Sequence, residues 1–283
     1  MSMITLLTDF GNQDAYVAVM KGAIASIAPN VKLCDLTHGI SPQDILAARF
    51  NLMLAYPYFP LGTIHLAVVD PGVGSARRGV AIQCPRGFLV GPDNGLFSGV
   101  LAEETVIEAV SLTNTRYWRV DSASNTFHGR DIFAPVAAHL ANGVSIDALG
   151  DRILPETLVQ PKIPPMVRLR SEPVAYAGSL QYIDAFGNLI SNIPGDRVPG
   201  KVWRVVIEGG GEAAASKPQR SSQEPLYIQG KETYSDVPVG ELTAVVGSHG
   251  WIEIACNGGS AAQYLQSARL QNAIGLAIVL EAL

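Results

Sequence analysis

Hydrophobic and polar positions in the first half of the chain alternate between the period of strands and the period of helices. Continuous apolar runs over 4–8, 31–36 and 63–69 are typical of buried strands. Between these runs, apolar residues recur every three or four positions and predict amphipathic helices. The helical positions are Val17, Met20, Ile24 and Ile27 in the first helix and Ile45, Ala48 and Leu52 in the second.

The order strand, helix, strand, helix, strand predicts right-handed crossovers and a parallel sheet. We expect the second helix to begin at Ser41, because Ser41-Pro42-Gln43-Asp44 offers a capping hydroxyl, a proline and a nearby carboxylate. Beyond the third strand, the segments 80–83 and 88–90 flank Pro85-Arg86-Gly87 and predict a hairpin. A further helix is expected from Asp131 to Leu140.

The composition changes near the middle of the chain, where prolines gather that neither a helix nor a central strand would tolerate. We expect a linker at 161–173, between a first domain over 1–160 and a second over 174–283. The fold class is therefore α/β, with an N-terminal mainly parallel sheet and flanking helices, followed by a smaller C-terminal mainly β, barrel-like domain. The Gly-, Ala- and Ser-rich segment 209–225 is expected to be a loop. Strand patterns in the second domain cover 174–183, 202–208, 241–246 and 251–255.

Composition and charge narrow the range of partners. The chain of 283 residues is 48% hydrophobic and 16% charged, and its net charge of −5 argues against nucleic acid as a partner. Cys34, Cys84 and Cys256 are far apart, which favours reduced thiols in a cytoplasmic protein over disulfides or a zinc site. No apolar run reaches the roughly 18 residues of a membrane helix, and the first residues lack the pattern of a signal peptide.

Asp70 is the most informative polar position. The strand over 63–69 ends on this carboxylate and breaks into a Pro-Gly turn that leads to Arg77 and Arg78. Ligands of open α/β sheets bind at the carboxyl ends of the strands, so this segment is a candidate site. An Asp before Pro is also ordinary turn chemistry, and the segment alone supports both interpretations equally.

Other polar side chains stand at strand ends and before helices. Asp9 ends the first strand, where one carboxylate could accept both hydroxyls of a ribose, although a helix N-cap is the simpler interpretation. His128 lies in a polar loop before a helix, whereas His65, inside an apolar strand, is typical of a buried core histidine. His38, just past a strand end, is ambiguous. In the second domain, Gly-containing turns carry polar side chains at 184–188, 247–251 and 257–260.

Six motifs follow one another along the chain: Thr8-Asp9-Phe10-Gly11, Val69-Asp70-Pro71-Gly72-Val73-Gly74, Gly91-Pro92-Asp93-Asn94-Gly95, Phe127-His128-Gly129-Arg130-Asp131, Phe186-Gly187-Asn188 and Ser191-Asn192-Ile193. In this order they resemble the S-adenosylmethionine hydroxide adenosyltransferase family, relatives of the fluorinase and chlorinase. The resemblance covers essentially the whole chain. It implies a hydrolase that forms adenosine and methionine from S-adenosylmethionine by attack of water at the ribose C5′.

The resemblance also implies which residues act. Hydrolases of the family activate water with an Asp-Arg-His set, which corresponds by motif position to Asp70, Arg77 and His128. Halogenating relatives have Tyr in place of Asp70 and Ser in place of Gly129, so this chain is more similar to the hydrolases. No cofactor and no metal are implied.

Substrate contacts are implied in the same way. Asp9 resembles the acceptor of the ribose diol, and Gln43 stands where halogenating relatives stack an aromatic ring on adenine. The family also implies a homotrimer with active sites at subunit interfaces. The other implied contacts are Asp184 and Asn188 at the methionine amino end, Phe186 beside adenine, Ser248 and His249 at the carboxylate, and Asn257 at the adenine edge.

Three alternatives stay open. A halogenase would convert chloride and S-adenosylmethionine to 5′-chloroadenosine. A non-catalytic module would bind adenosine or S-adenosylmethionine without turnover. A metal-dependent hydrolase would use Asp9, Asp14 and His38, and it would lose activity with a chelator.

Overall fold

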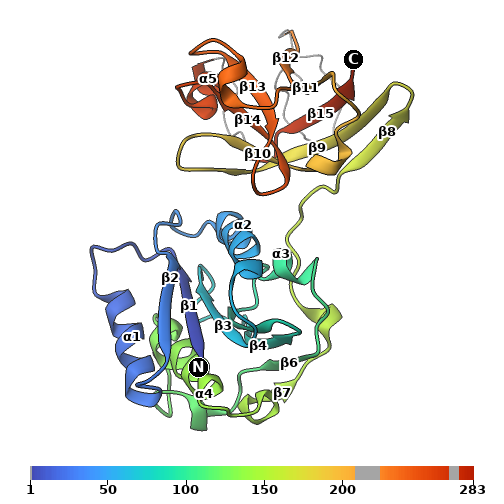
Figure 1. The fold of residues 1–283 in the computed structure, drawn as a ribbon. Coiled ribbons are helices and arrows are strands. Elements are labelled where there is room, and N and C mark those ends of the chain that lie inside the picture. The colour runs from blue at the N-terminus through green and yellow to red at the C-terminus, as the bar shows by residue number, and fades with distance from the viewer. Residues whose placement is uncertain (1, 208–223, 268–273) are drawn as a thin grey trace. The chain divides into compact units, whose positions relative to one another are not determined.

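The structure is a computed structural model that describes residues 2–207, 224–267 and 274–283. The chain divides into two compact units, Met1–Pro161 and Lys162–Leu283, and each is described by itself (Figure 1). The loop expected at 209–225 lies almost wholly outside the described residues.

The N-terminal unit packs helices on both faces of a sheet. Within the described residues its strands are β1 Met3–Thr8, β2 Lys32–Thr37, β3 Thr63–Val68, β4 Gly79–Cys84, β5 Gly87–Pro92, β6 Glu108–Ser111 and β7 Asp151–Arg152. Its helices are α1 Tyr16–Ile27, α2 Ile45–Ala55, α3 Ser98–Leu101 and α4 Ala134–Ala141, and a π-helical turn covers Gly129–Phe133. No helix in the described part of the chain is long and apolar enough to cross a membrane.

The sheet of this unit has the order β2-β1-β3-β5-β4-β6-β7. The strands β2, β1, β3 and β5 run parallel, as the crossovers predicted. From β5 to β7 the pairing is antiparallel, because the tight turn between β4 and β5 returns the chain beside itself as a hairpin. The predicted α/β class with flanking helices is confirmed, and the sheet is mixed rather than uniformly parallel.

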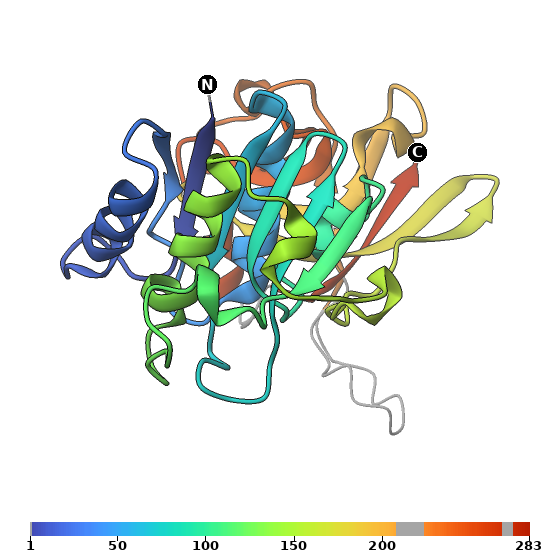
Figure 2. The ribbon, with the colours of Figure 1, turned by 90° about the horizontal axis from the view of Figure 1, so that it is seen from below.

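Alternate side chains of the strands enter two layers of the core. Ile4 and Leu6 of β1 are fully buried in a cluster with Met20 of α1 and Val136 of α4. The opposite face of β1 and β2 is covered by α2. Figure 2 shows α4 lying across the strands on the first of these faces. This packing holds the ends of β1 and β3 side by side, with Thr8 paired to Val68.

The second helix begins later than predicted. α2 starts after Asp44, whose Oδ1 accepts a hydrogen bond of 2.9 Å from the Ala47 amide, so Asp44 and not Ser41 is the N-cap. Gln43 has a φ of +68°, which is incompatible with a helical turn. The segment from Ser41 to Gln43 therefore forms a turn before the helix.

The C-terminal unit is a nearly closed antiparallel barrel, as predicted. Its sheet has the order β12-β11-β15-β9-β10-β14-β13, and a bridge from Gly230 to Ala244 links its two ends. β8 pairs with β9, so part of the segment expected as a linker is a strand. The described elements are β8 Val167–Ser171, β9 Val174–Ile183, β10 Leu189–Pro194, β11 Trp203–Ile207, β12 Leu226–Gln229, β13 Leu242–Val246, β14 Trp251–Cys256, α5 Ala261–Ser267 and β15 Ala277–Ala282.

Candidate active site

Asp70 stands in the loop that leaves β3, at the carboxyl edge of the parallel strands. The loop is fixed on both sides: the Asn94 side chain donates a 2.8 Å hydrogen bond to the Val69 carbonyl, and the Val73 amide donates one of 3.2 Å to the Asp70 carbonyl. The Asp70 side chain is only 5% exposed. A buried carboxylate needs partners, and those partners define the site.

Arg77 and His128 are those partners. The Arg77 Nε donates to Asp70 Oδ1 at 2.8 Å, and its Nη2 donates to Asp70 Oδ2. The same Nη2 lies 2.9 Å from His128 Nδ1. The three residues predicted from separate motifs are thus joined in one hydrogen-bonded set, which we call the Asp-Arg-His set.

Close approach of two loops creates this set. Gly74 has a φ of +76°, and a Cβ on it would lie 2.3 Å from the Asn125 carbonyl oxygen. The loop after β3 can therefore contact the loop that leads to His128. The second loop is tied down by Asp131, whose carboxylate accepts hydrogen bonds from Arg119, Arg130 and the Ser124 amide. Asp131 is 1% exposed, and its pKa is lowered by these donors, the Arg130 side chain first.

A π-helical turn follows His128 directly. This turn, Gly129–Phe133, leads into α4 without a break. It presents the Phe133 ring beneath the Arg77 guanidinium, 5.2 Å from its centre, while His128 lies 6.4 Å from the same ring. Phe133 shields the Asp-Arg-His set, and no pattern in the sequence distinguished it from the other apolar residues of the predicted helix.

The surroundings favour the neutral form of His128. Burial, reinforced by the Arg77 guanidinium, lowers the pKa of His128 against the opposing effects of Asp70 and Asp131. Because arginine only donates hydrogen bonds, Nδ1 of His128 is the acceptor in its contact with Arg77. A neutral ring then carries its proton on Nε2.

The neighbouring arginine serves another purpose. Arg78 donates to Asp93 through Nε at 3.0 Å and through Nη2 at 2.6 Å, and it also binds the Thr157 carbonyl. Asp93 in turn accepts from the Val159 amide. This second Asp–Arg pair fastens the last segment of the N-terminal unit to its sheet, and it contains no histidine.

Asp9 lies at the end of β1, on the same edge as Asp70. Its Oδ2 accepts a 2.8 Å hydrogen bond from the Gln43 amide, and it does not cap α1, whose N-cap is Ala15. The interpretation of Asp9 as a helix N-cap is therefore wrong. Beside it, the rings of Phe10, Tyr16 and Phe127 pack within 5.8 Å of one another. A hollow of about 350 Å³ adjoins them, lined by Asp14, Ala15, Tyr16, Val19, Phe127 and Arg130.

His65 and His38 each contact a threonine of β1. His65 is 2% exposed and bonded to Thr5, which confirms it as a core histidine. The His38 ring faces Thr8 and Asp35. Among the described residues, no group of three acidic, histidine or cysteine side chains is arranged to hold a metal ion. The alternative that uses Asp9, Asp14 and His38 thus has no ligand set there.

In the C-terminal unit, Asp184 organises the turn between β9 and β10. Its carboxylate accepts from the amides of Phe186 and Asn188 and from the Asn188 side chain, at 2.8–2.9 Å. Phe186 is 79% exposed at the tip of this turn. Gly187 has a φ of +82°, and a Cβ there would lie 2.0 Å from the Ser260 hydroxyl oxygen. These residues form one preorganised polar turn with an exposed ring.

The remaining predicted contacts lie at opposite ends of β14. Asn257 follows its carboxyl end, near the Asp184 turn, because Leu189 pairs with Ile254; its side chain donates to the Val237 carbonyl at 2.7 Å. Ser248 is exposed in the turn before the amino end of β14. His249 beside it has both ring nitrogens engaged: Nε2 lies 2.9 Å from Glu253 Oε2, and Nδ1 lies 3.1 Å from the Trp251 amide.

Sequence reasoning did not single out Glu253 and Tyr234. Glu253 is 3% exposed, and its second carboxylate oxygen accepts a 2.8 Å hydrogen bond from the Tyr234 hydroxyl. Burial, with this hydrogen bond, raises the pKa of Tyr234 to about 12. A glutamate in the apolar strand Trp251–Cys256 is the one signal in the sequence that could have identified the cluster.

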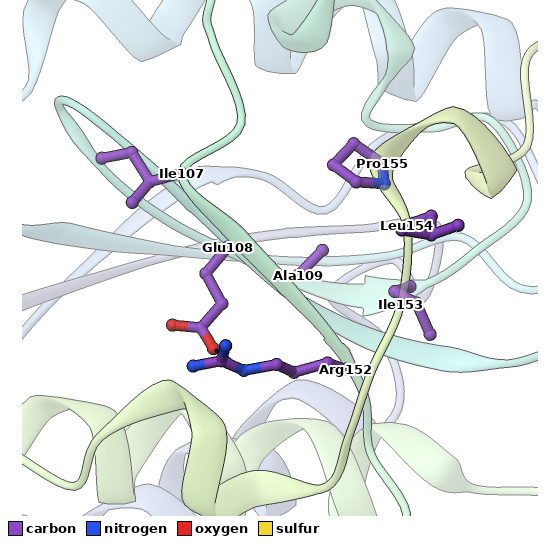
Figure 3. A pocket seen from close by; sticks show the side chains of 7 residues that line it. All are labelled: Ile107, Glu108, Ala109, Arg152, Ile153, Leu154 and Pro155. Atoms are coloured by element: carbon purple, nitrogen blue, oxygen red, sulfur yellow. Dashed lines mark ion pairs between the residues drawn. The ribbon is translucent and has the colours of Figure 1, made fainter.

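A second hollow, of about 350 Å³, lies at the edge of the N-terminal sheet and is drawn in Figure 3. Its polar groups, Glu108 and Arg152, pair with each other at 2.8 Å, and the rest of its lining is apolar. No member of the Asp-Arg-His set lines it.

Comparison with known proteins identifies the family. The model of the SAM hydroxide adenosyltransferase N-terminal domain matches residues 4–150, and that of the corresponding C-terminal domain matches residues 178–272. The chain belongs to the SAM hydroxide adenosyltransferase family. The family resemblance predicted from the six motifs is therefore confirmed.

The hydrolase relatives within this family are similar along nearly the whole chain. The (R)-S-adenosyl-L-methionine hydrolase of Salinispora tropica is 38% identical over 263 residues, 93% of each chain. That of Thermus thermophilus is 38% identical over 273 residues, 94% of this chain and 96% of the relative. A fluorinase from Actinoplanes is 28% identical over 215 residues, 68% of this chain and 71% of the relative.

A solved structure supports the same fold. An uncharacterized conserved protein from Thermotoga maritima superposes with a TM-score of 0.83 at 33% identity, covering 98% of this chain and all of the other. The hydroxide adenosyltransferase fold, a mixed sheet with helices followed by a β-barrel, thus extends over both units.

Proposed function

We propose that the protein hydrolyses S-adenosyl-L-methionine to adenosine and L-methionine. The observation that carries this proposal is the Asp-Arg-His set at the carboxyl edge of the N-terminal sheet. Relatives at 38% identity over more than 90% of the chain are hydrolases of this compound, which supports the same reaction here. In the reaction, the oxygen of water bonds to C5′ as the C5′–S bond breaks. The bonding pair leaves with sulfur as a neutral thioether, and one proton is released.

The geometry assigns a different role to each member of the set. Both carboxylate oxygens of Asp70 are oriented by Arg77, and each keeps a lone pair with which to accept a proton from water. His128 cannot accept through Nδ1, which Arg77 occupies, so its Nε2–H donates to the oxygen of the attacking water. Asp70 is thus the proposed base, Arg77 orients the pair, and His128 positions the nucleophile.

The substrate contacts belong to the same proposal. Asp9 receives the ribose diol, Asp184 and Asn188 receive the methionine amino end, and Phe186 packs beside adenine. Ser248 contacts the carboxylate through its exposed hydroxyl. His249 would have to give up one of its hydrogen bonds to do the same, and Asn257, proposed for the adenine edge, would have to release Val237.

The assay that tests the function follows product formation in ¹⁸O-labelled water. The substrate is supplied as both sulfonium epimers, because the hydrolase relatives are specific by name for the (R) form. We expect adenosine and methionine, with the label in the 5′-hydroxyl of adenosine. Unlabelled adenosine would exclude attack of water at C5′. Binding without turnover would favour the non-catalytic module, and 5′-chloroadenosine in chloride would favour a halogenase.

Acidic pH should inactivate the enzyme through His128. The neutral ring accepts from Arg77, so activity is full above the pKa of His128 and is lost as the pH falls through it. Because that pKa is lowered by burial and by Arg77, the acid limb of kcat/KM should lie below the ordinary histidine value of about 6.5. His128→Asn should remove this limb. A limb at or above that value, or one unchanged in the variant, would contradict the assignment.

The proposal also includes the oligomeric state and the cellular compartment. A homotrimer in which the N-terminal unit of one subunit meets the C-terminal unit of its neighbour would unite the two groups of residues. Light scattering tests it by the mass in solution: three chains support it and one chain opposes it. The free thiols of Cys34, Cys84 and Cys256 are compatible with the cytoplasm, where we place the reaction.

A further inference from the structure

A line of polar contacts runs from helix α1 to the end of β1. It begins at Lys21, whose Nζ donates to Asp35 Oδ2 at 2.6 Å. Asp35 Oδ1 lies 3.2 Å from His38 Nε2, and His38 Nδ1 lies 2.9 Å from Thr8 Oγ1. The His38 side chain is 4% exposed, and Thr8 is fully buried. None of these four residues belongs to the Asp-Arg-His set.

A neutral His38 ring with its proton on Nε2 is compatible with the contacts of this line. Thr8 Oγ1 accepts the Phe10 amide at 3.2 Å, so its hydroxyl proton is available for His38 Nδ1. The His38 proton then lies on Nε2, where it faces the Asp35 carboxylate. Although burial acts to raise the pKa of Asp35, the hydrogen bonds from Lys21 and His38 lower it, which keeps this carboxylate ionised. The 3.2 Å separation of His38 Nε2 and Asp35 Oδ1 is an ion-pair distance, and the hydrogen bonds of the line are those at Lys21 and at Thr8.

The line ends on either side of Asp9. Thr8 precedes Asp9 and binds the amide that follows it, that of Phe10. The next amide, of Gly11, donates to the His38 carbonyl at 2.9 Å. His38 therefore fixes the backbone before and after Asp9, once through its side chain and once through its main chain. The carboxylate of Asp9 is left to meet the Gln43 amide and whatever binds at this edge.

We infer that His38 is a positioning residue, which acts through Thr8 to aim the Asp9 carboxylate at the ribose of the substrate. The inference rests on the proposed role of Asp9. It assigns a use to a buried histidine that takes no part in activating water. The expected consequence is on affinity, because Asp9 contacts the substrate and not the nucleophile.

The chain offers a matched control for this inference. Thr5, also on β1, is fully buried and lies 2.9 Å through Oγ1 from His65 Nδ1, the same pair of groups at the same distance. This pair lies inside the strand, away from Asp9. Thr5→Val and Thr8→Val each remove one buried hydroxyl bonded to a histidine, so both should lower Tm. Thr8→Val should lower it more, because the Phe10 amide loses its acceptor as well.

The two variants should differ in affinity. For Thr8→Val we expect KM for S-adenosylmethionine and Kd for adenosine to rise about three- to tenfold, the range expected for one net hydrogen bond, with kcat nearly unchanged. Thr8→Ser restores the hydroxyl and should return both constants close to the wild-type values. Thr5→Val should leave both constants unchanged.

Equal effects of Thr5→Val and Thr8→Val on affinity, or a fall in kcat alone, would overturn the inference. So would the failure of Thr8→Ser to restore binding. The adenosine titration by calorimetry does not depend on turnover. If the wild-type protein failed to hydrolyse S-adenosylmethionine, the proposed function would be wrong, while the adenosine constants would still decide whether the Thr8 hydroxyl, the contact of His38, positions Asp9.

Discussion

Asp70→Asn should abolish most of the turnover while leaving substrate affinity nearly unchanged. Asparagine keeps the shape of the side chain, yet it cannot take a proton from water, and its amide group opposes one of the Arg77 donors. Loss of a positioned base typically costs about 10²- to 10⁴-fold in rate. The loss should appear in kcat, measured by adenosine formation at saturating substrate, and not in Kd measured by calorimetry.

Asp93→Asn provides the matched control for this variant. Asp93 also makes a two-donor contact with an arginine, Arg78, but that pair fastens a segment of the chain and contains no histidine. We expect its Tm to fall, since a buried polar pair is disturbed, while kcat per folded molecule stays close to that of the wild-type protein. If Asp70→Asn retains near-full turnover, Asp70 is only a turn residue, and the base must be sought elsewhere.

Asp9→Ala should have the opposite kinetic signature. Removal of the carboxylate takes away the proposed acceptor of both ribose hydroxyls, and an unpaired polar group costs about 1–3 kcal/mol. Kd for adenosine should therefore rise by roughly 5- to 150-fold, measured by calorimetry, with a smaller change in kcat. The variant also removes the partner of the Gln43 amide, so Tm is recorded to separate folding from binding.

Asp14→Ala is the control on the same loop. Asp14 is exposed and lines the hollow beside Tyr16, and no hydrogen bond of its side chain holds Asp9 in place. Its substitution should change neither Kd for adenosine nor kcat by more than about twofold, as expected of an exposed surface site. A large loss in Asp14→Ala, accompanied by sensitivity to a chelator, would instead support the metal-dependent alternative.

The edge of the sheet that carries Asp9 and Asp70 was predictable because its signals are local. Buried strands ending at Thr8 and Val68 are parallel and adjacent, so their following carboxylates, Asp9 and Asp70, had to share an edge. The helical spacing through Val17, Met20 and Ile24 likewise gave α1, whose buried residues are these three.

Other features depend on contacts between distant segments and could not be read in advance. The N-cap at Asp44 depends on the left-handed turn at Gln43. This turn is stabilised by the hydrogen bond that the Gln43 amide donates to the Asp9 carboxylate. The strand β8 forms only because β9 lies beside it, although prolines flank its sequence. The divergent roles of the adjacent Arg77 and Arg78 follow from which carboxylate each one reaches. Hydrophobic pattern alone carries none of this information.

The π-helical turn at Gly129–Phe133 has a consequence for how the site can vary. Such a turn contains one residue more than an α-helical turn, and each helical residue rotates the chain by about 100°. The extra residue therefore rotates His128 about the helix axis, relative to where an uninterrupted α-helix continuing from α4 would place it. Core packing and the aim of the histidine meet in Phe133, the last residue of this turn. Phe133 is fully buried in the core with Val136 of α4, and its ring also packs against Arg77 and beside His128, so a substitution that repacks this core position should also disturb the histidine.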